Sequence, residues 1–299
     1  MTNIPKQERA QILTEALPYI QEFYDKVVVI KYGGNAMINE ERKQQVMEDI
    51  VLLSLVGIKV VLVHGGGPEI TETLERMGKQ TEFVNGLRVT DRETAQIVQM
   101  VLAGKINKTL VNLLQMHGGR AMGISGMDGH MIRAKMKNPA LGYVGEITDV
   151  DIRPIKDLLE KGYIPVVSTV GCDEHGNAYN INADTAAAYI AGAMRAFRLI
   201  SMTDIAGILQ NRNDPSSLIP VITVEQAVHL FETGVISGGM IPKVECCIDA
   251  IHLGVERVVI LDGRVPHALL LEMLTDEGVG TQVIPTAPCE NDTCENKTE

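Results

Sequence analysis

Short apolar runs and amphipathic stretches alternate along most of this chain. The apolar runs at 26–31 and 59–64 have the length of buried strands. Between them, apolar residues recur at helical spacing over 41–56. Strands that alternate with helices are typical of βαβ units, whose strands pair in parallel. The pattern therefore predicts an α/β protein built on a mainly parallel sheet.

Further strands and helices follow in the same alternation. Strands are predicted at 163–169, 197–204 and 257–263, and a β-ribbon at 127–138. Helices are predicted at 68–77, 90–116, 151–162, 179–194, 223–232, 241–252 and 267–278. Because both faces of a parallel sheet need covering, we expect a three-layer αβα sandwich around an open sheet.

Local signals predict how some of these elements begin. Asn85 and Gly86 lie between apolar residues and predict a tight hairpin, which places Arg88 on the strand after the turn. Two helices are expected to open with capping boxes. The pairs are Thr90 with Glu93 and Thr223 with Gln226.

Apolar residues at helical spacing also predict an amphipathic helix ahead of the first strand. Pro18 is expected to kink this helix. The apolar positions are Ile12, Leu13, Ala16, Leu17, Ile20, Phe23 and Tyr24.

The chain is long enough, at 299 residues, for two lobes. A soft boundary is expected near 192–197, where a long helix gives way to a new strand. We therefore expect an N-lobe at 26–194 and a C-lobe at 195–286, which share one continuous sheet. The helix at 1–25 precedes them, and a disordered polar tail is expected at 287–299.

Composition narrows the class of partner. The formal net charge of −11 argues against nucleic acid and anionic membranes, which both need a basic face. No apolar run approaches the length of a membrane span, and the first residues lack the layout of a signal peptide. We expect a soluble, cytoplasmic protein whose five cysteines are free thiols, without a metal site of its own.

Three glycine-rich turns carry the candidate chemistry: KYGGN at 31–35, HGGGP at 64–68 and SGGMIPK at 237–243. At the carboxyl ends of strands, such turns let backbone N–H groups approach an anion. Any one of them could equally be a tight turn, and His64 alone is more often structural than catalytic. The chain has neither a P-loop nor a dinucleotide fingerprint after a strand.

The motifs VIKYGG, VLVHGGGPEI, NGLRVTD, YNINADTAAA, SMTDIAGIL and GGMIPKV, in this order, resemble the amino acid kinase family. Within it, HGGGPEI with GLRVTD and NINAD is most similar to the members that phosphorylate N-acetyl-L-glutamate. The resemblance covers 26–284. It implies phosphoryl transfer from ATP to the side-chain carboxylate of that substrate, in arginine biosynthesis, with Mg²⁺ held mainly by the phosphates. The alternatives are a glutamate, carbamate, aspartate or lysine-pathway kinase, or a non-catalytic nucleotide-binding regulator.

The resemblance also implies roles for individual residues. Lys31 and Lys243 match the lysines that stabilise the transferring phosphoryl group, and Asp184 matches the aspartate that orients them. Asp184 is equally a candidate N-cap of the helix that follows it. The acylamino acid is implied to contact Gly66, Gly67, Arg88 and Asn180, and ATP is implied to contact Gly33, Gly34, Asp204, Gly207, Gly238, Gly239 and Lys243.

Two segments resemble those of arginine-inhibited members of the family. The helix at 1–25 is similar to one that interlaces dimers into a hexamer, a trimer of dimers. The segment at 267–281 resembles an arginine site, with Tyr24, Glu272 and Gly278 as candidate contacts for L-arginine. The alternatives are that the N-terminal helix packs on the chain's own surface and that the segment at 267–281 contains a core helix. A PII-type signalling partner cannot be read from the sequence.

Overall fold

The computed structural model describes residues 5–37, 39–211, 214–276 and 278–286. The polar tail predicted at 287–299 lies outside these residues. Within them, Cys172, Cys246 and Cys247 are free thiols, as predicted. None of the helices in the described part of the chain is both long and apolar enough to cross a bilayer.

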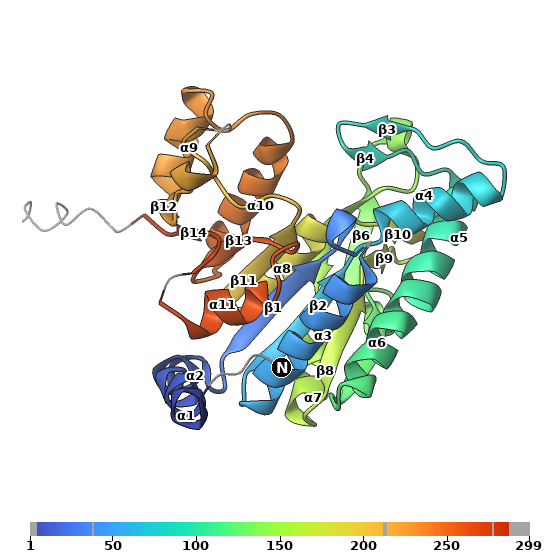
Figure 1. Cartoon of the computed structure of the whole chain (residues 1–299). Coiled ribbons are helices and arrows are strands. Elements are labelled where there is room, and N and C mark those ends of the chain that lie inside the picture. The colour runs from blue at the N-terminus through green and yellow to red at the C-terminus, as the bar shows by residue number, and fades with distance from the viewer. Residues whose placement is uncertain (1–4, 38, 212–213, 277, 287–299) are drawn as a thin grey trace, which may run out of the picture.

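An eight-stranded sheet forms the middle of the molecule, in the order β12-β14-β13-β11-β1-β2-β8-β5 (Figure 1). All neighbours pair in parallel except β13 and β14. The mainly parallel sheet is therefore confirmed. Its strands are β1 (Val27–Tyr32), β2 (Lys59–His64), β5 (Ala121–Ser125), β8 (Ile164–Ser168), β11 (Arg198–Thr203), β12 (Val221–Thr223), β13 (Val258–Asp262) and β14 (Thr281–Ile284).

Helices cover both faces of this sheet, which confirms the three-layer αβα sandwich. Alternate residues of β1 belong to different cores: Val28 and Ile30 pack on one face and Val29 packs on the other. The first face is covered by α3 (Glu40–Leu55), α4 (Gly67–Arg76), α5 (Arg92–Gln99), α6 (Asn107–Met116) and α11 (Ala268–Leu274). The second is covered by α7 (Arg153–Glu160), α8 (Ala183–Met194), α9 (Val224–Glu232) and α10 (Ile241–His252).

A smaller four-stranded sheet packs on the second face, in the order β10-β9-β6-β7. Its antiparallel β6 (Ile132–Met136) and β7 (Gly145–Val150) confirm the predicted ribbon. The strands β9 (Val170–Cys172) and β10 (Ala178–Asn180) were not predicted, because three residues carry too little periodicity. Single turns of 3₁₀-helix lie at Gly34–Met37, Asp128–His130, Pro139–Leu141, Pro215–Ser217 and Gly238–Met240.

The predicted hairpin is confirmed, whereas one of the two capping boxes is wrong. The strands β3 (Phe83–Val84) and β4 (Leu87–Arg88) pair antiparallel around Asn85 and Gly86, whose φ values of 50° and 76° suit this turn. The Thr223 box at the start of α9 is present.

At the start of α5, Asp91 takes the place predicted for Thr90. The carboxylate of Asp91 accepts a hydrogen bond from the Thr94 N–H at 2.6 Å, while the Thr90 hydroxyl donates to the Arg88 carbonyl at 2.7 Å. The predicted long helix does extend to Met116, but Met100–Ile106 is π-helical.

The N-terminal helix is broken as predicted near Pro18. It divides into α1 (Lys6–Glu15) and α2 (Leu17–Phe23), and Pro18 lies in the first turn of α2, where its missing N–H costs no hydrogen bond. The two helices lie beside α11 in Figure 1, and α2 contacts α11. Phe23 is buried edge-on against Phe197, with ring centroids 5.4 Å apart.

Candidate active site

Lys31 and Asp184 form a buried ion pair at the carboxyl end of the central strands. Lys31 lies on the same face of β1 as Val29, which is the face that α8 covers. Asp184 lies in the first turn of α8, and its Oδ1 is 2.9 Å from Nζ of Lys31. Ser201, the partner of Lys31 in the β1–β11 register, donates to the same oxygen at 3.3 Å.

Charge around Asp184 outweighs the effect of its burial. Burial alone would raise the pKa of this carboxyl group, but Lys31, followed by Lys243 and the Ser201 hydrogen bond, brings the pKa below its ordinary value. The carboxylate is therefore ionised at neutral pH. The alternative of Asp184 as the N-cap is wrong, because Asn182 caps α8 by accepting from the Thr185 N–H at 3.0 Å.

The ion pair lines a cavity of about 270 Å³, called here the central cavity. Its walls come from the ends of β1, β4 and β10, from the turn after β2 and from the first turns of α4, α8 and α10. The structure thus brings together nine residues predicted from separate motifs. They are Lys31, Gly33, Gly34, Gly66, Gly67, Arg88, Asn180, Asp184 and Lys243.

Arg88 brings an unpaired cation to this cavity. The residue is only 5% exposed, and burial lowers the pKa of its guanidinium. Nη2 donates to the Gly67 carbonyl and to the Thr71 hydroxyl, each at 2.9 Å, and the group stacks over the Phe83 ring at 4.7 Å. Among the described residues, no carboxylate forms an ion pair with it. A buried arginine held in place by neutral groups is suited to an anionic ligand.

The other predicted substrate contacts border the same space. Gly66 and Gly67 begin α4, so backbone N–H groups without intrahelical partners lie at this wall. The side-chain amide of Asn180, at the end of β10, donates to the Thr90 hydroxyl at 3.4 Å. The cavity therefore combines backbone donors, an amide and three cationic side chains around one carboxylate.

A second cavity of about 590 Å³, called here the C-terminal cavity, lies between the loop after β11 and the start of α10. Lys243 lines both cavities and so joins them. Of the residues predicted to contact ATP, Asp204, Gly207 and Gly239 line the C-terminal cavity, while Gly33 and Gly34 line the central one. Gly238 precedes Gly239 but does not itself line either cavity.

Gly207 has a structural reason of its own to be glycine. Its φ of 139° is unfavourable for other residues, and a Cβ there would lie 2.5 Å from Oγ1 of Thr281. That hydroxyl accepts a hydrogen bond from the Ile208 N–H at 2.8 Å. Gly207 therefore shapes the C-terminal cavity by letting the loop after β11 pack against β14.

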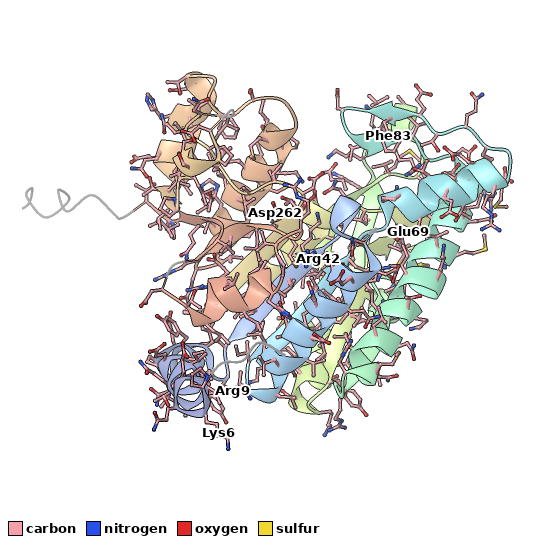
Figure 2. The ribbon with its side chains drawn as sticks, viewed as in Figure 1. Lys6, Arg9, Arg42, Glu69, Phe83 and Asp262 are labelled. Atoms are coloured by element: carbon pink, nitrogen blue, oxygen red, sulfur yellow. The ribbon has the colours of Figure 1, made fainter. Side chains whose placement is uncertain are left out.

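Ser201 and Arg264 are polar residues at or beside these cavities that were not predicted as site residues. Ser201 contacts Asp184 only because β11 lies beside β1, and nothing in the local sequence around it indicates that pairing. Arg264 lines the C-terminal cavity and is held by Asp262, with Nη2 2.8 Å from Oδ2. Figure 2 shows Asp262 and Phe83 on opposite halves of the molecule.

The three candidate arginine contacts do not all meet. Glu272 is buried, and its Oε2 accepts hydrogen bonds from the N–H groups of Val279 and Gly280 at 2.9 and 3.2 Å. A Cβ on Gly278 would lie 3.1 Å from that oxygen, so Glu272 and Gly278 are neighbours. Tyr24 is 64% exposed, and its ring lies against Gly57 instead.

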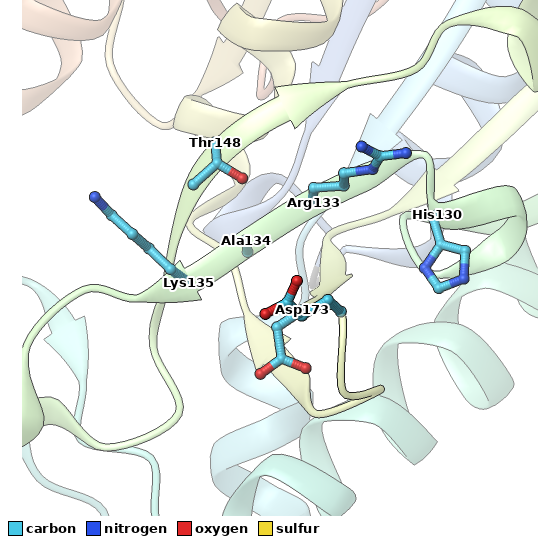
Figure 3. A pocket seen from close by; sticks show the side chains of 7 residues that line it. His130, Arg133, Ala134, Lys135, Thr148 and Asp173 are labelled. Carbon is cyan, nitrogen blue, oxygen red and sulfur yellow. The ribbon is translucent and has the colours of Figure 1, made fainter.

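A further cavity, of about 510 Å³, lies on the smaller sheet and contains none of the predicted residues. Figure 3 shows Asp173 between Lys135 and His130, with Arg133 above it. Charged groups of this cavity have partners within the protein. Lys135 pairs with Glu146 at 3.3 Å, and Asp173 accepts a hydrogen bond from the Asn177 side chain at 2.8 Å. The central cavity, with its unpaired arginine, is the stronger candidate.

The fold and the central cavity together define an α/β protein that binds an anionic ligand at the carboxyl ends of parallel strands. The sequence profile described as the Amino acid kinase family matches residues 26–262. The chain belongs to this family.

Among its relatives is the acetylglutamate kinase of Brachyspira hyodysenteriae (strain ATCC 49526 / WA1), 53% identical over 94% of this chain and 98% of the relative. The acetylglutamate kinase of Thermoanaerobacter pseudethanolicus (strain ATCC 33223 / 39E) is 54% identical over 92% and 93% of the two chains.

A solved structure of similar fold is N-acetylglutamate synthase from Neisseria gonorrhoeae, complexed with coenzyme A and N-acetyl-glutamate. The TM-score is 0.81 at 24% identity, and the match covers 93% of this chain but only 64% of the synthase chain.

Proposed function

We propose that this protein transfers the γ-phosphoryl group of ATP to the side-chain carboxylate of N-acetyl-L-glutamate. The product is N-acetyl-L-glutamyl 5-phosphate, an intermediate of arginine biosynthesis. The proposal rests above all on the Lys31–Asp184 pair and on Lys243, which lies between two adjoining cavities. It is supported by acetylglutamate kinases that share about half of their residues with this chain.

The acceptor carboxylate is ionised at neutral pH, so the reaction needs no general base. The obstacle is repulsion between this carboxylate and the phosphates of ATP. In the proposed reaction, Lys31 and Lys243 stabilise the negative charge on the transferring group, and Asp184 holds Lys31 in place at 2.9 Å. The carboxylate oxygen attacks the γ-phosphorus, the bond to the β–γ bridging oxygen breaks, and ADP leaves with the electron pair.

The two substrates are assigned to the two cavities. Arg88 binds the α-carboxylate of the acylamino acid, and Asn180, Gly66 and Gly67 contact the rest of it. The adenine nucleotide occupies the C-terminal cavity, next to Asp204, Gly207, Gly238 and Gly239, with its phosphates directed to Lys243, Gly33 and Gly34. Mg²⁺ enters with ATP as part of the substrate and is held mainly by phosphate oxygens.

This assignment gives each part of the chain a role. The N-lobe at 26–194 binds the acylamino acid, and the C-lobe at 195–286 binds ATP. The helices α1 and α2 join protomers into a hexamer, a trimer of dimers, and L-arginine binds beside Glu272 and Gly278. The protein acts in the cytoplasm.

Release of ADP in the presence of MgATP and each acceptor in turn tests the proposal. We expect turnover with N-acetyl-L-glutamate and at least 100-fold lower kcat/KM with glutamate, carbamate or aspartate. Glutamate and aspartate carry an ammonium group in place of the acetylated amide, and carbamate lacks the α-carboxylate that is assigned to Arg88. Faster turnover with another acceptor would assign the chain to a different kinase of the family. Nucleotide binding without turnover of any acceptor would favour a non-catalytic regulator.

A further inference from the structure

His64 is a buried histidine to which the proposed reaction assigns no role. It ends β2, immediately before the turn Gly65–Gly67, and is 0% exposed. Its Nδ1 lies 3.0 Å from the carbonyl oxygen of Gly65, and its Nε2 lies 3.2 Å from Nδ2 of Asn107. Because His64 does not line the central cavity, it can act on a ligand there only through the turn.

The contacts of Asn107 determine which ring nitrogen of His64 carries the proton. Nδ2 of Asn107 also donates to the Val166 carbonyl at 2.8 Å, and its Oδ1 accepts from Lys108 at 3.1 Å, which fixes the orientation of the amide. An amide nitrogen can only donate, so Nε2 of His64 accepts and the proton is on Nδ1. Burial lowers the pKa of His64 to about 4, so the ring is neutral at pH 7.

In this tautomer, Nδ1–H donates to the Gly65 carbonyl. That carbonyl and the N–H of Gly66 belong to one planar trans peptide group, in which they point in opposite directions. When the Gly65 carbonyl points towards the imidazole, the Gly66 N–H therefore points away from the imidazole. Gly66 itself lines the central cavity. The preceding peptide is held as well, because the Gly65 N–H donates to the Tyr32 carbonyl at 3.2 Å.

The π-helical segment Met100–Ile106 supports the same turn from the other side. A Cβ on Gly66 would lie 2.1 Å from Cδ1 of Ile106 and 2.9 Å from Cδ2 of Leu102, so both side chains pack directly on the glycine. Asn107 follows this segment immediately. Insertions of π-helix shift the register of a helix and occur frequently at functional sites. Here one segment both packs on Gly66 and holds His64.

We propose that His64 and Asn107 are positioning residues that aim the Gly66 N–H at the acceptor carboxylate. This inference rests on the proposed function. A donor that is already aligned loses no orientational freedom when the acceptor carboxylate binds, so its hydrogen bond contributes more to the affinity for the substrate. Neither residue touches the substrate, and both act through the turn.

Two substitutions of His64 separate this role from simple packing. In His64→Asn, the side-chain amide nitrogen takes the place of Nδ1 and can still donate to Gly65. In His64→Gln, the side-chain amide nitrogen takes the place of Nε2, so it cannot donate to the Gly65 carbonyl. His175→Gln is the control, since His175 is exposed.

We expect His64→Gln to raise KM for N-acetyl-L-glutamate about tenfold, the effect of one misaligned hydrogen bond, with KM for ATP within about twofold of its original value. His64→Asn should restore most of the loss. Equal defects in the two variants, parallel rises in both KM values, or no rise in either variant would overturn the inference.

The tautomer itself can be measured in the unaltered protein by ¹⁵N NMR of the histidine rings. We expect one neutral ring, protonated on Nδ1, that does not titrate down to about pH 5. A ring protonated on Nε2 would overturn the inference even if neither variant folds. If the unaltered protein fails to turn over N-acetyl-L-glutamate, the proposed function fails, whereas this measurement still decides the orientation of the turn.

Discussion

Lys31 and Lys243 both line the central cavity, but their contacts with Asp184 differ. Lys31 is 6% exposed and paired with Asp184, while Lys243 is partly exposed and acts on Asp184 only at longer range. Removal of Lys31 would leave the Asp184 carboxylate buried without its nearest cation, and such uncompensated charges are strongly destabilising. Removal of Lys243 leaves the buried pair intact.

Substitution of either lysine by alanine should therefore lower activity, but only one substitution should lower stability. For both Lys31→Ala and Lys243→Ala we expect kcat to fall about 10²- to 10³-fold with smaller changes in KM. Thermal unfolding should show a lower Tm for Lys31→Ala alone. Lys135→Ala, which removes an exposed lysine, is the control. An unchanged kcat with a raised KM would reject the role of that lysine.

Single residues differ in how well the sequence indicated them. Lys31, Gly66 and Lys243 were predicted as site residues from short motifs of glycine and lysine. Residues that are adjacent in such a motif also lie together in the site. Ser201 escaped prediction because its contact with Asp184 depends on the pairing of β1 with β11, which are far apart in sequence. Asn182 and Asp184 are both possible N-caps by residue type. Asn182 is the N-cap because α8 begins at Ala183.

At the scale of elements, α3 and α11 are joined by a hydrogen bond between Asp49 and His267. Asp49 of α3 is 1% exposed, and its Oδ1 lies 2.6 Å from Nδ1 of His267, the residue before α11. The other carboxylate oxygen, Oδ2, has no hydrogen-bond partner. Burial raises the pKa of Asp49 to about 6, although the hydrogen bond with His267 opposes the rise.

The contact between Asp49 and His267 should make the free energy of unfolding depend on pH. Between about pH 4 and pH 6, Asp49 is protonated in the folded chain but ionised in the unfolded chain. The bound proton therefore stabilises the folded chain at low pH, and this contribution is lost as the pH rises through about 6. Asp49→Asn carries no such titration. Relative to the unaltered protein, its free energy of unfolding should rise by about 2 to 3 kcal/mol between pH 4 and pH 7.

Urea unfolding across this pH range measures the difference. Asp157→Asn, at an exposed position of α7, is the matched control and should show no such trend. A constant difference between Asp49→Asn and the unaltered protein would contradict the raised pKa of Asp49.

Most helices and long strands were predictable because many residues share one periodicity, but β5 was not predicted. The prediction of 241–252 coincides with α10, and that of 59–64 coincides with β2. The segment from Arg92 to Met116 was correct as one helix, but apolar spacing did not reveal its π-helical turn. The short strand β9 pairs with its chain neighbour β10 and also with β6, which is distant in sequence, and local sequence does not encode the second pairing.

At the scale of the whole molecule, the N-terminal helices leave an apolar surface uncovered. Ile12, Leu13 and Leu17 are 50%, 75% and 48% exposed, whereas Phe23 at the end of α2 is buried. Exposed apolar stripes of this kind mark contact surfaces. Their location on α1 and α2 agrees with the proposed role in assembly.

Deletion of residues 1–24 should reduce the oligomer to a smaller species and abolish inhibition by L-arginine, while catalysis by the remaining sites is retained. Because this deletion also removes Phe23, the double substitution Leu13→Glu with Leu17→Glu is the milder variant. Light scattering after gel filtration measures the mass, and ADP release with and without L-arginine measures inhibition. An unaltered mass and unaltered inhibition in both variants would refute the role of these helices.

Each half of the large sheet is built from one uninterrupted run of chain. The strands β1, β2, β5 and β8 precede Arg195, the strands β11 to β14 follow it, and the two sets meet along the ladder between β1 and β11. A gene divided after Arg195 would thus encode two fragments, each with four adjacent strands and one of the two lysines. Restored turnover would then report that the fragments had found each other, which makes the protein a candidate split reporter.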